Sequence, residues 1–85
     1  MAKVVMYSAD WCPYCRRAEA LLQSKRAEVE KIDVDAEPQR RREMMARSGR
    51  RTVPQIWIGA THVGGCDELY DLEREGRLDA LLGAR

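Results

Sequence analysis

Two cysteines separated by a proline and a tyrosine, Cys12 and Cys15, are the side chains of this chain best suited to covalent chemistry. They follow an apolar run at residues 4–7, which predicts a strand, and they precede a helical pattern at residues 16–25. The pair therefore lies at a strand-to-helix junction, where free backbone N–H groups and the helix dipole favour a thiolate. Because a thiolate is the nucleophile of thiol–disulfide exchange, the pattern indicates redox chemistry.

The two thiols are expected to differ in role. If Pro13 opens the helix, Cys12 lies at or near its N-cap, where the sulfur can accept hydrogen bonds from backbone N–H groups of Tyr14 or Cys15. Cys15 lies one turn further in, closer to the core and less accessible. We therefore expect Cys12 to attack a disulfide and Cys15 to resolve the mixed disulfide that results.

A structural zinc site is the competing interpretation of the two cysteines. Such a site needs two further ligands, and only His62 and Cys66 remain, which do not form a second pair of the usual pattern. The odd number of cysteines, three, also argues against a framework of structural disulfides. Redox chemistry is favoured, and no bound metal is expected.

Length and composition limit the class of protein. Eighty-five residues correspond to one small domain over residues 1–85. A formal net charge of +1 argues against a nucleic-acid-binding protein. No apolar run approaches the roughly 18 residues of a membrane span, and the N-terminal run is too short for a secretory signal. We therefore expect a cytoplasmic protein without membrane or nucleic-acid partners.

Hydrophobic periodicity predicts alternating strands and helices, with a hairpin before the last helical region. The expected strands span residues 3–8, 28–35, 55–58 and 61–63. The expected first and third helices span about residues 13–25 and 66–75, and a short helical piece follows at 78–82. Asp35, Glu37 and Pro38 supply start signals for the second helix, which would end near Ser48 with Gly49 as its cap. The order βαβαββα predicts an α/β fold, a mixed sheet with helices on both faces.

Three motifs together resemble those of the glutaredoxin family, in particular its short bacterial dithiol form. They are the motif from Cys12 to Cys15, then Thr52-Val53-Pro54, and finally Gly64-Gly65-Cys66-Asp67. The resemblance covers essentially the whole chain. It implies the thioredoxin fold with a central four-stranded sheet, and a monomeric glutathione-disulfide oxidoreductase. Glutathione would be the co-substrate, and disulfide-bonded or glutathionylated proteins would be the partners.

The resemblance also implies a glutathione-binding site. Pro54 would be a cis-proline beside the thiols, Val53 would pair its backbone with the peptide part of glutathione, and Thr52 would help to position this turn. Tyr14 would flank the glutathionyl sulfur. The turn at residues 65–67 would hold the γ-glutamyl end. Its chemistry agrees, because the N–H groups that open a helix suit a carboxylate and an aspartate suits an ammonium group.

One departure from the family pattern concerns charge. Many glutaredoxins have a lysine three residues before the first cysteine, where it contacts the glycyl carboxylate of glutathione, and this chain has Ala9 there. Arg51 and Arg41 match family positions that approach the same carboxylate, and arginine suits bidentate carboxylate binding. Arg47 and Arg50 are nearby in the sequence. We expect Arg51 to belong to the site. The competing interpretation assigns these arginines to a solvated, charged helix face.

The sequence also suggests the surroundings of four further side chains. The Cys66 thiol is expected to be a small buried group, with an oxidisable thiol near the site as the alternative. His62 is expected to be a solvated residue of the edge hairpin rather than a base. Trp11 is expected to shield the site or to contact protein partners, and Trp57 to belong to the core or the sheet surface.

Two other functions compete with the glutathione-dependent reductase. One is a redoxin recharged by thioredoxin reductase, which the match of residues 64–67 to the γ-glutamyl site disfavours. The other is a glutaredoxin that holds a [2Fe–2S] cluster between two protomers through its first cysteine and two glutathiones. Pro13 and the second active-site cysteine resemble instead the forms that work mainly as reductases.

Overall fold

The computed structural model of the chain describes residues 2–83. Strands and helices alternate along it as the sequence predicts. They are β1 (Val4–Ser8), α1 (Pro13–Ser24), β2 (Val29–Asp33), α2 (Pro38–Ser48), β3 (Gln55–Ile58), β4 (Thr61–Gly64), α3 (Cys66–Arg74) and the short α4 (Leu78–Leu82).

The strands form a mixed sheet in the order β2-β1-β3-β4. β1 pairs in parallel with β2 and antiparallel with β3, and β4 pairs antiparallel with β3 at the edge. The central strands β1 and β3 are almost entirely buried, as their continuous apolar runs predict. The expectation of a four-stranded mixed sheet flanked by helices is confirmed.

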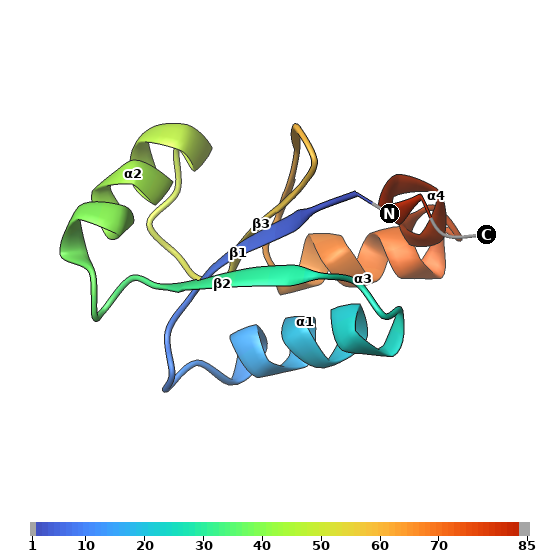
Figure 1. The fold of residues 1–85 in the computed structure, drawn as a ribbon, viewed down its shortest axis with the longest axis horizontal. Helices are drawn as coiled ribbons and strands as arrows, with labels where there is room; N and C mark the ends of the chain where they lie inside the picture. Colours follow the sequence, from blue (N-terminus) through green and yellow to red (C-terminus); the bar gives the residue numbers. More distant parts are fainter. Residues whose placement is uncertain (1, 84–85) are drawn as a thin grey trace.

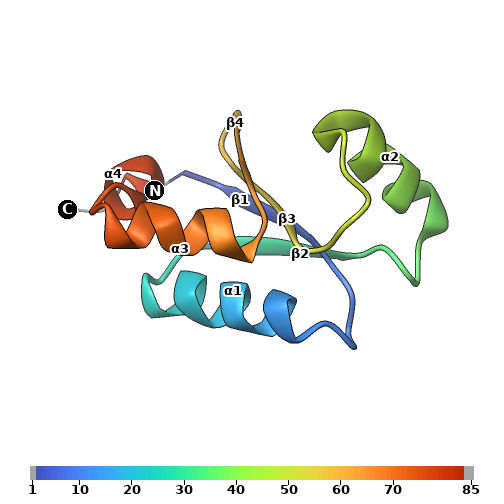
Figure 2. The ribbon, with the colours of Figure 1, turned by 180° about the vertical axis from the view of Figure 1, so that it is seen from behind.

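Helices cover both faces of this sheet. In Figures 1 and 2, α1 and α3 lie side by side on one face, and α2 lies on the opposite side. The alternation of side chains along a strand explains the two layers. Val4 and Met6 of β1 belong to the core beneath α1 and α3. Tyr7, which points the other way, packs with Trp57 and with Met44 of α2.

Local signals set the ends of the helices. Pro13 and Pro38 occupy the first turns of α1 and α2, where a missing backbone N–H costs nothing. Gly49 ends α2 in the left-handed conformation, with φ of 71°, as predicted. α2 has a thin apolar stripe, in which Met44 is the buried residue.

Several element boundaries differ from the prediction. β2 ends at Asp33 rather than at residue 35, because the Asp33 carboxylate accepts hydrogen bonds from the backbone N–H groups of Asp35 (2.9 Å) and Ala36 (3.2 Å). This Asx turn diverts the chain from the sheet. β4 continues to Gly64, one residue beyond the prediction, and α3 ends at Arg74, one residue before it.

A β-bulge interrupts the pairing of β4 with β3. Ile56 pairs with Gly64 and Trp57 pairs with His62, so that Val63 has no partner of its own on β3. The extra residue sharpens the local twist of the edge strand and re-aims the side chains on either side of it. His62 and Trp57 lie directly opposite each other, which places their rings on the same face of the sheet.

Replacing Gly64 by alanine should destabilise the fold more than replacing Gly59. Both glycines have positive φ, +112° and +59°, which costs a side chain about 1–2 kcal/mol. A Cβ at position 59 meets nothing within 4 Å, whereas at position 64 it would lie 2.5 Å from the Glu68 carboxylate. Urea denaturation should show losses of roughly 1 kcal/mol for Gly59→Ala and roughly 2–4 kcal/mol for Gly64→Ala. Equal losses would contradict a steric demand at position 64.

Candidate active site

Cys12 is the N-cap residue of α1, with extended backbone angles (φ −86°, ψ 111°). Its sulfur accepts a hydrogen bond from the backbone N–H of Cys15 at 3.2 Å, as the sequence predicts for a cysteine at this position. The Cys12 thiol also lies 3.7 Å from the carbonyl oxygen of Val53, to which it donates. A helix N-terminus and a distant loop therefore meet at one sulfur atom, and the helix end favours negative charge on it.

Both thiols are nearly buried, each residue being 2% exposed, and they pack with Ala9 and Val53. Burial, followed by the neighbouring Cys12 thiol, raises the pKa of Cys15 to about 11. Cys15 is therefore a protonated thiol near neutral pH. Desolvation keeps the second thiol neutral, whereas the first one lies at a helix N-terminus. That Cys12 attacks and Cys15 resolves stays a prediction.

A cavity of about 220 Å³ opens beside the dithiol. Its walls come from the start of α1, the loop that enters β3, and the start of α3. It is lined by Tyr14, Arg50, Thr52, Val53, Pro54, Gly65, Cys66, Asp67 and Glu68. Every residue that the sequence assigned to glutathione binding lines this cavity except Arg51.

The wall that enters β3 contains the predicted cis-proline. The Val53–Pro54 peptide bond is cis. The opposite wall comes close to it, since a Cβ on Gly65 would lie 3.4 Å from the Pro54 carbonyl oxygen. The start of α3 therefore lies within contact distance of the proline loop.

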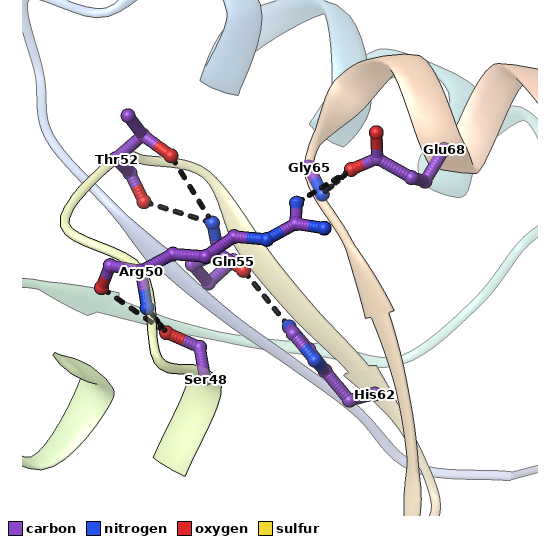
Figure 3. Close-up of polar contacts among 7 residues, drawn as sticks. All are labelled: Ser48, Arg50, Thr52, Gln55, His62, Gly65 and Glu68. Carbon is purple, nitrogen blue, oxygen red and sulfur yellow. Dashed lines mark hydrogen bonds and ion pairs between the residues drawn. The ribbon is translucent and has the colours of Figure 1, made fainter. Parts of the chain in front are cut away.

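Arg50 and Glu68 join the two walls. The sequence indicated Arg50 only as a cation near the expected position, and it did not indicate Glu68. Arg50 Nη1 lies 2.9 Å from Glu68 Oε1, which also accepts the backbone N–H of Gly65 at 2.6 Å (Figure 3). The Gly65 N–H, and then the Arg50 guanidinium, lower the pKa of Glu68. The capping-box spacing from the helix N-cap to a glutamate three residues later is the signal that could have identified Glu68.

The backbone of Arg50 is held by the side chain of Ser48. The Ser48 hydroxyl accepts the backbone N–H of Arg50 at 2.9 Å and donates to its carbonyl oxygen at 3.2 Å. Figure 3 shows the Arg50 side chain running from this turn across to Gly65 and Glu68. Arg51, the next residue, is exposed and does not line the cavity. The cation that faces the cavity is thus one position earlier than the sequence indicated.

The other residues considered for the glycyl carboxylate lie outside this cavity. Arg41 forms an ion pair with Asp35 at 2.8 Å, and Trp11 Nε1 donates to the same carboxylate at 2.7 Å. The Trp11 N–H, and then Arg41, lower the pKa of Asp35. Ala9 is 2% exposed and packs against the dithiol. The Cβ of residue 9 is therefore buried beside the two cysteines and does not line the cavity.

The third cysteine, the two tryptophans and the histidine differ in burial. Cys66 is 5% exposed and belongs to the core beneath α1 and α3, and burial raises the pKa of its thiol. It is the small buried residue that was expected, with its backbone at the cavity. Trp57 is a core residue. Trp11 is 65% exposed at the start of the dithiol loop. His62 is an exposed residue of the edge strand, but its ring is engaged by Gln55.

Among residues 2–83, no group of three or more His, Cys, Asp or Glu side chains is arranged to hold a metal ion. None of the helices in this range is long and apolar enough to cross a membrane.

An N-cap cysteine facing a cis-proline loop, carried on a four-stranded mixed sheet, places the chain among dithiol proteins with the thioredoxin fold. Comparison with known proteins narrows this class. The glutaredoxin family profile matches residues 4–63. A glutaredoxin of Pseudomonas aeruginosa is 56% identical over 84 residues, which cover 99% of this chain and 100% of that protein. Glutaredoxin 3 of Escherichia coli K12 is 52% identical over 82 residues, covering 96% and 99%.

A solved structure agrees with these sequence relatives. The buckwheat glutaredoxin–glutathione complex superposes with a TM-score of 0.88 at 32% identity, covering 94% of this chain and 76% of that one. The chain therefore belongs to the glutaredoxin family, whose members are thiol–disulfide oxidoreductases. The resemblance read from the three motifs is confirmed, as is the thioredoxin fold.

Limited alkylation of the reduced protein with iodoacetamide at neutral pH should modify Cys12 well before Cys15. The reason is that Cys15, with its pKa raised to about 11, stays protonated until the pH approaches that value. Mass spectrometry of peptides across a pH series measures both sites, and a Cys66→Ser background removes the third thiol. Modification of Cys15 should rise only at strongly alkaline pH. Equal rates at the two cysteines at pH 7 would contradict the assignment.

Proposed function

We propose that this protein is a glutathione-dependent reductase of protein–glutathione mixed disulfides and of protein disulfides. The observation that carries the proposal is the position of Val53, which lines the cavity and also contacts the Cys12 thiol. A peptide bound along the loop of residues 52–54 would therefore present its sulfur to Cys12. The buckwheat relative, solved as a glutaredoxin–glutathione complex, supports the same choice of ligand.

Glutathione has charged groups that the cavity could recognise. Its γ-glutamyl carboxylate suits the backbone N–H groups of Gly65 and Cys66 at the start of α3, and its ammonium group suits Asp67. Arg50, which lines the same cavity, offers a guanidinium to the glycyl carboxylate. Tyr14, 55% exposed at the mouth, would flank the bound sulfur.

Removal of glutathione from a protein requires one enzyme thiol. The Cys12 thiolate attacks the glutathionyl sulfur, a Cys12–glutathione disulfide forms, and the protein leaves as a thiolate that takes up a proton. A second glutathione thiolate then attacks the glutathionyl sulfur on Cys12. Oxidised glutathione leaves and the Cys12 thiolate is restored. In this cycle the thiol of the second glutathione is oxidised to a disulfide sulfur and the sulfur of the substrate protein is reduced to a thiol, while the first glutathionyl sulfur stays in a disulfide throughout.

Reduction of a protein disulfide requires both enzyme thiols. Cys12 forms a mixed disulfide with the substrate, and Cys15 must lose its proton before it attacks Cys12 and releases the reduced substrate. The high pKa of Cys15 therefore places proton removal within this step. Two glutathione molecules reduce the resulting Cys12–Cys15 disulfide. We propose that the protein does this work as a monomer in the cytoplasm.

Two experiments separate this function from the alternatives named above. Turnover with glutathione as the sole reductant is expected here and not for a redoxin recharged by thioredoxin reductase. A [2Fe–2S] protein would be coloured after anaerobic purification, whereas a reductase without a cluster would show no visible absorption.

Cys15→Ser should retain deglutathionylation and lose reduction of protein disulfides by the dithiol route, whereas Cys12→Ser should lose both. A single thiol with a second glutathione suffices for the first reaction. The second depends on a neighbouring thiol whose effective concentration no free thiol matches. The measurements are turnover of a glutathionylated peptide and of a disulfide-bonded protein by each variant. Equal losses for Cys15→Ser in the two assays would contradict the proposed roles.

Arg50→Gln should raise KM for a glutathionylated peptide, and Arg51→Gln, its matched control, should change it less. Arg50 lines the cavity and Arg51 does not. The contact is solvent-exposed, so we expect a loss of about 0.5–1 kcal/mol, or roughly two- to five-fold in KM, that shrinks as salt rises. The rate of Cys12 alkylation should stay constant in both variants. A larger effect of Arg51→Gln would return the carboxylate site to Arg51, the residue that the sequence favours.

A further inference from the structure

We propose that Gln55 and His62 are positioning residues that hold the Thr52–Pro54 wall of the cavity from behind. The inference rests on the proposed function, because the wall belongs to the proposed glutathione site. The contacts that support it are drawn in Figure 3. There, the Gln55 side chain lies between Thr52 on one side and His62 on the other. Neither residue lines the cavity.

The first link is the side-chain amide of Gln55. This residue is fully buried at the start of β3, a strand whose other residues are apolar. Its Nε2 donates to the backbone carbonyl oxygen of Thr52 at 3.1 Å and lies 3.3 Å from the Thr52 hydroxyl oxygen. A carbonyl oxygen only accepts hydrogen bonds, so the amide must turn its NH₂ group toward Thr52. Its oxygen, Oε1, must then face the other way.

The second link follows from the orientation of that amide. Gln55 Oε1 lies 2.8 Å from His62 Nε2. Because Oε1 only accepts, Nε2 must carry the proton, which fixes the tautomer of the neutral ring and leaves Nδ1 as the unprotonated nitrogen. The bond is also made by the imidazolium form. The charged groups around the ring are Arg47 on α2, Arg50 before β3 and Glu68 on α3.

The third link is the stacking that fixes His62 itself. Its ring lies 4.5 Å from the Trp57 ring, centroid to centroid, at an interplanar angle of 25°. The bulge at Val63 places the two residues directly across from each other. The Arg47 guanidinium lies 4.3 Å from the Trp57 ring centroid and donates to the Tyr7 hydroxyl at 2.8 Å. The imidazole is therefore anchored on a packed aromatic cluster.

The consequence concerns a loop that has no regular secondary structure. Residues 50–54 enter β3 outside any helix or strand, and Thr52 itself is exposed. Its carbonyl oxygen is held by a buried side chain that is in turn held by an edge strand. The adjacent Val53 backbone, which contacts Cys12, thereby keeps its orientation before any ligand binds. A preorganised binding surface loses less entropy when the ligand arrives.

The tautomer of His62 is the first test, and it needs no substrate. A long-range ¹H–¹⁵N correlation spectrum of the free protein resolves its single histidine. We expect the proton on Nε2. If the proton is found on Nδ1, the Gln55 amide has the opposite orientation, its oxygen faces the Thr52 carbonyl, and the proposal is overturned.

Two His62 variants then test the link without disturbing a buried position. His62→Phe keeps a ring against Trp57 and removes the donor, whereas His62→Gln removes the ring and keeps an amide donor. Thr61→Val, on the same exposed strand, is the matched control. We expect amide hydrogen exchange at Val53 to be faster in His62→Phe, less so in His62→Gln, and unchanged in Thr61→Val. Gln55→Leu should show the largest effect, with thermal denaturation as the check on its folding.

Kinetics with a glutathionylated peptide complete the test. A lost hydrogen bond corresponds to roughly a three- to ten-fold rise in KM for His62→Phe, with kcat and the rate of Cys12 alkylation nearly unchanged. Unchanged Val53 exchange in both His62→Phe and a folded Gln55→Leu overturns the positioning role. Faster exchange with unchanged KM also overturns it, since the wall would then not matter for binding. A wild-type protein without glutathione turnover refutes the proposed function instead, and the exchange data still decide the positioning.

Discussion

The Cys12 thiol and the Val53 carbonyl oxygen lie 3.7 Å apart although 41 positions separate them in the chain. The sheet brings them together. β1 and β3 are antiparallel neighbours, so that the end of β1 lies beside the beginning of β3, with Tyr7 opposite Gln55. β4 returns antiparallel and ends with Gly64 beside Ile56. The dithiol loop, the proline loop and the start of α3 therefore meet at one end of the sheet.

The two thiols have different surroundings at this meeting point. Both are almost inaccessible, yet one sulfur accepts a helix N–H and the other is closed in beneath it. Desolvation favours the neutral form of a thiol, while unpaired N–H groups at a helix end favour the anion. A displacement of one helical turn therefore places one sulfur at the helix N-terminus and leaves the other as a protonated thiol. Pro13 contributes to this difference, because a proline in the first turn favours a helix that begins directly after Cys12.

Two charged groups at the cavity, Arg50 and Glu68, form an ion pair before any ligand binds. Glu68 bonds both to the backbone N–H of Gly65 and to Arg50, so one carboxylate links the start of α3 to the loop before β3. Behind this loop, Gln55 makes a second polar link through His62. Buried polar groups are tolerated when their hydrogen bonds are made, and such networks favour one arrangement over others. The two walls of the cavity are therefore held at separate points by polar contacts.

The sequence by itself determined which elements form and where the dithiol lies among them. Apolar runs marked the strands, Pro13 and Pro38 marked the helix starts, and Cys12 was placed at an N-cap from local signals alone. These features depend on residues a few positions apart. The residues of the cavity were recognised through motifs, since nothing in their spacing along the chain reveals that residues 14, 52–54 and 65–67 share a surface.

Only the tertiary structure decided which side chains face that surface. Arg50 lines the cavity and the adjacent Arg51 does not. Neighbouring residues of an extended loop point in different directions, so periodicity cannot choose between them. The link from Gln55 to His62 likewise depends on the register of β3 with β4 and on the bulge at Val63. A shift of one residue in that pairing would turn His62 to the other face, and register is set by packing across the whole sheet.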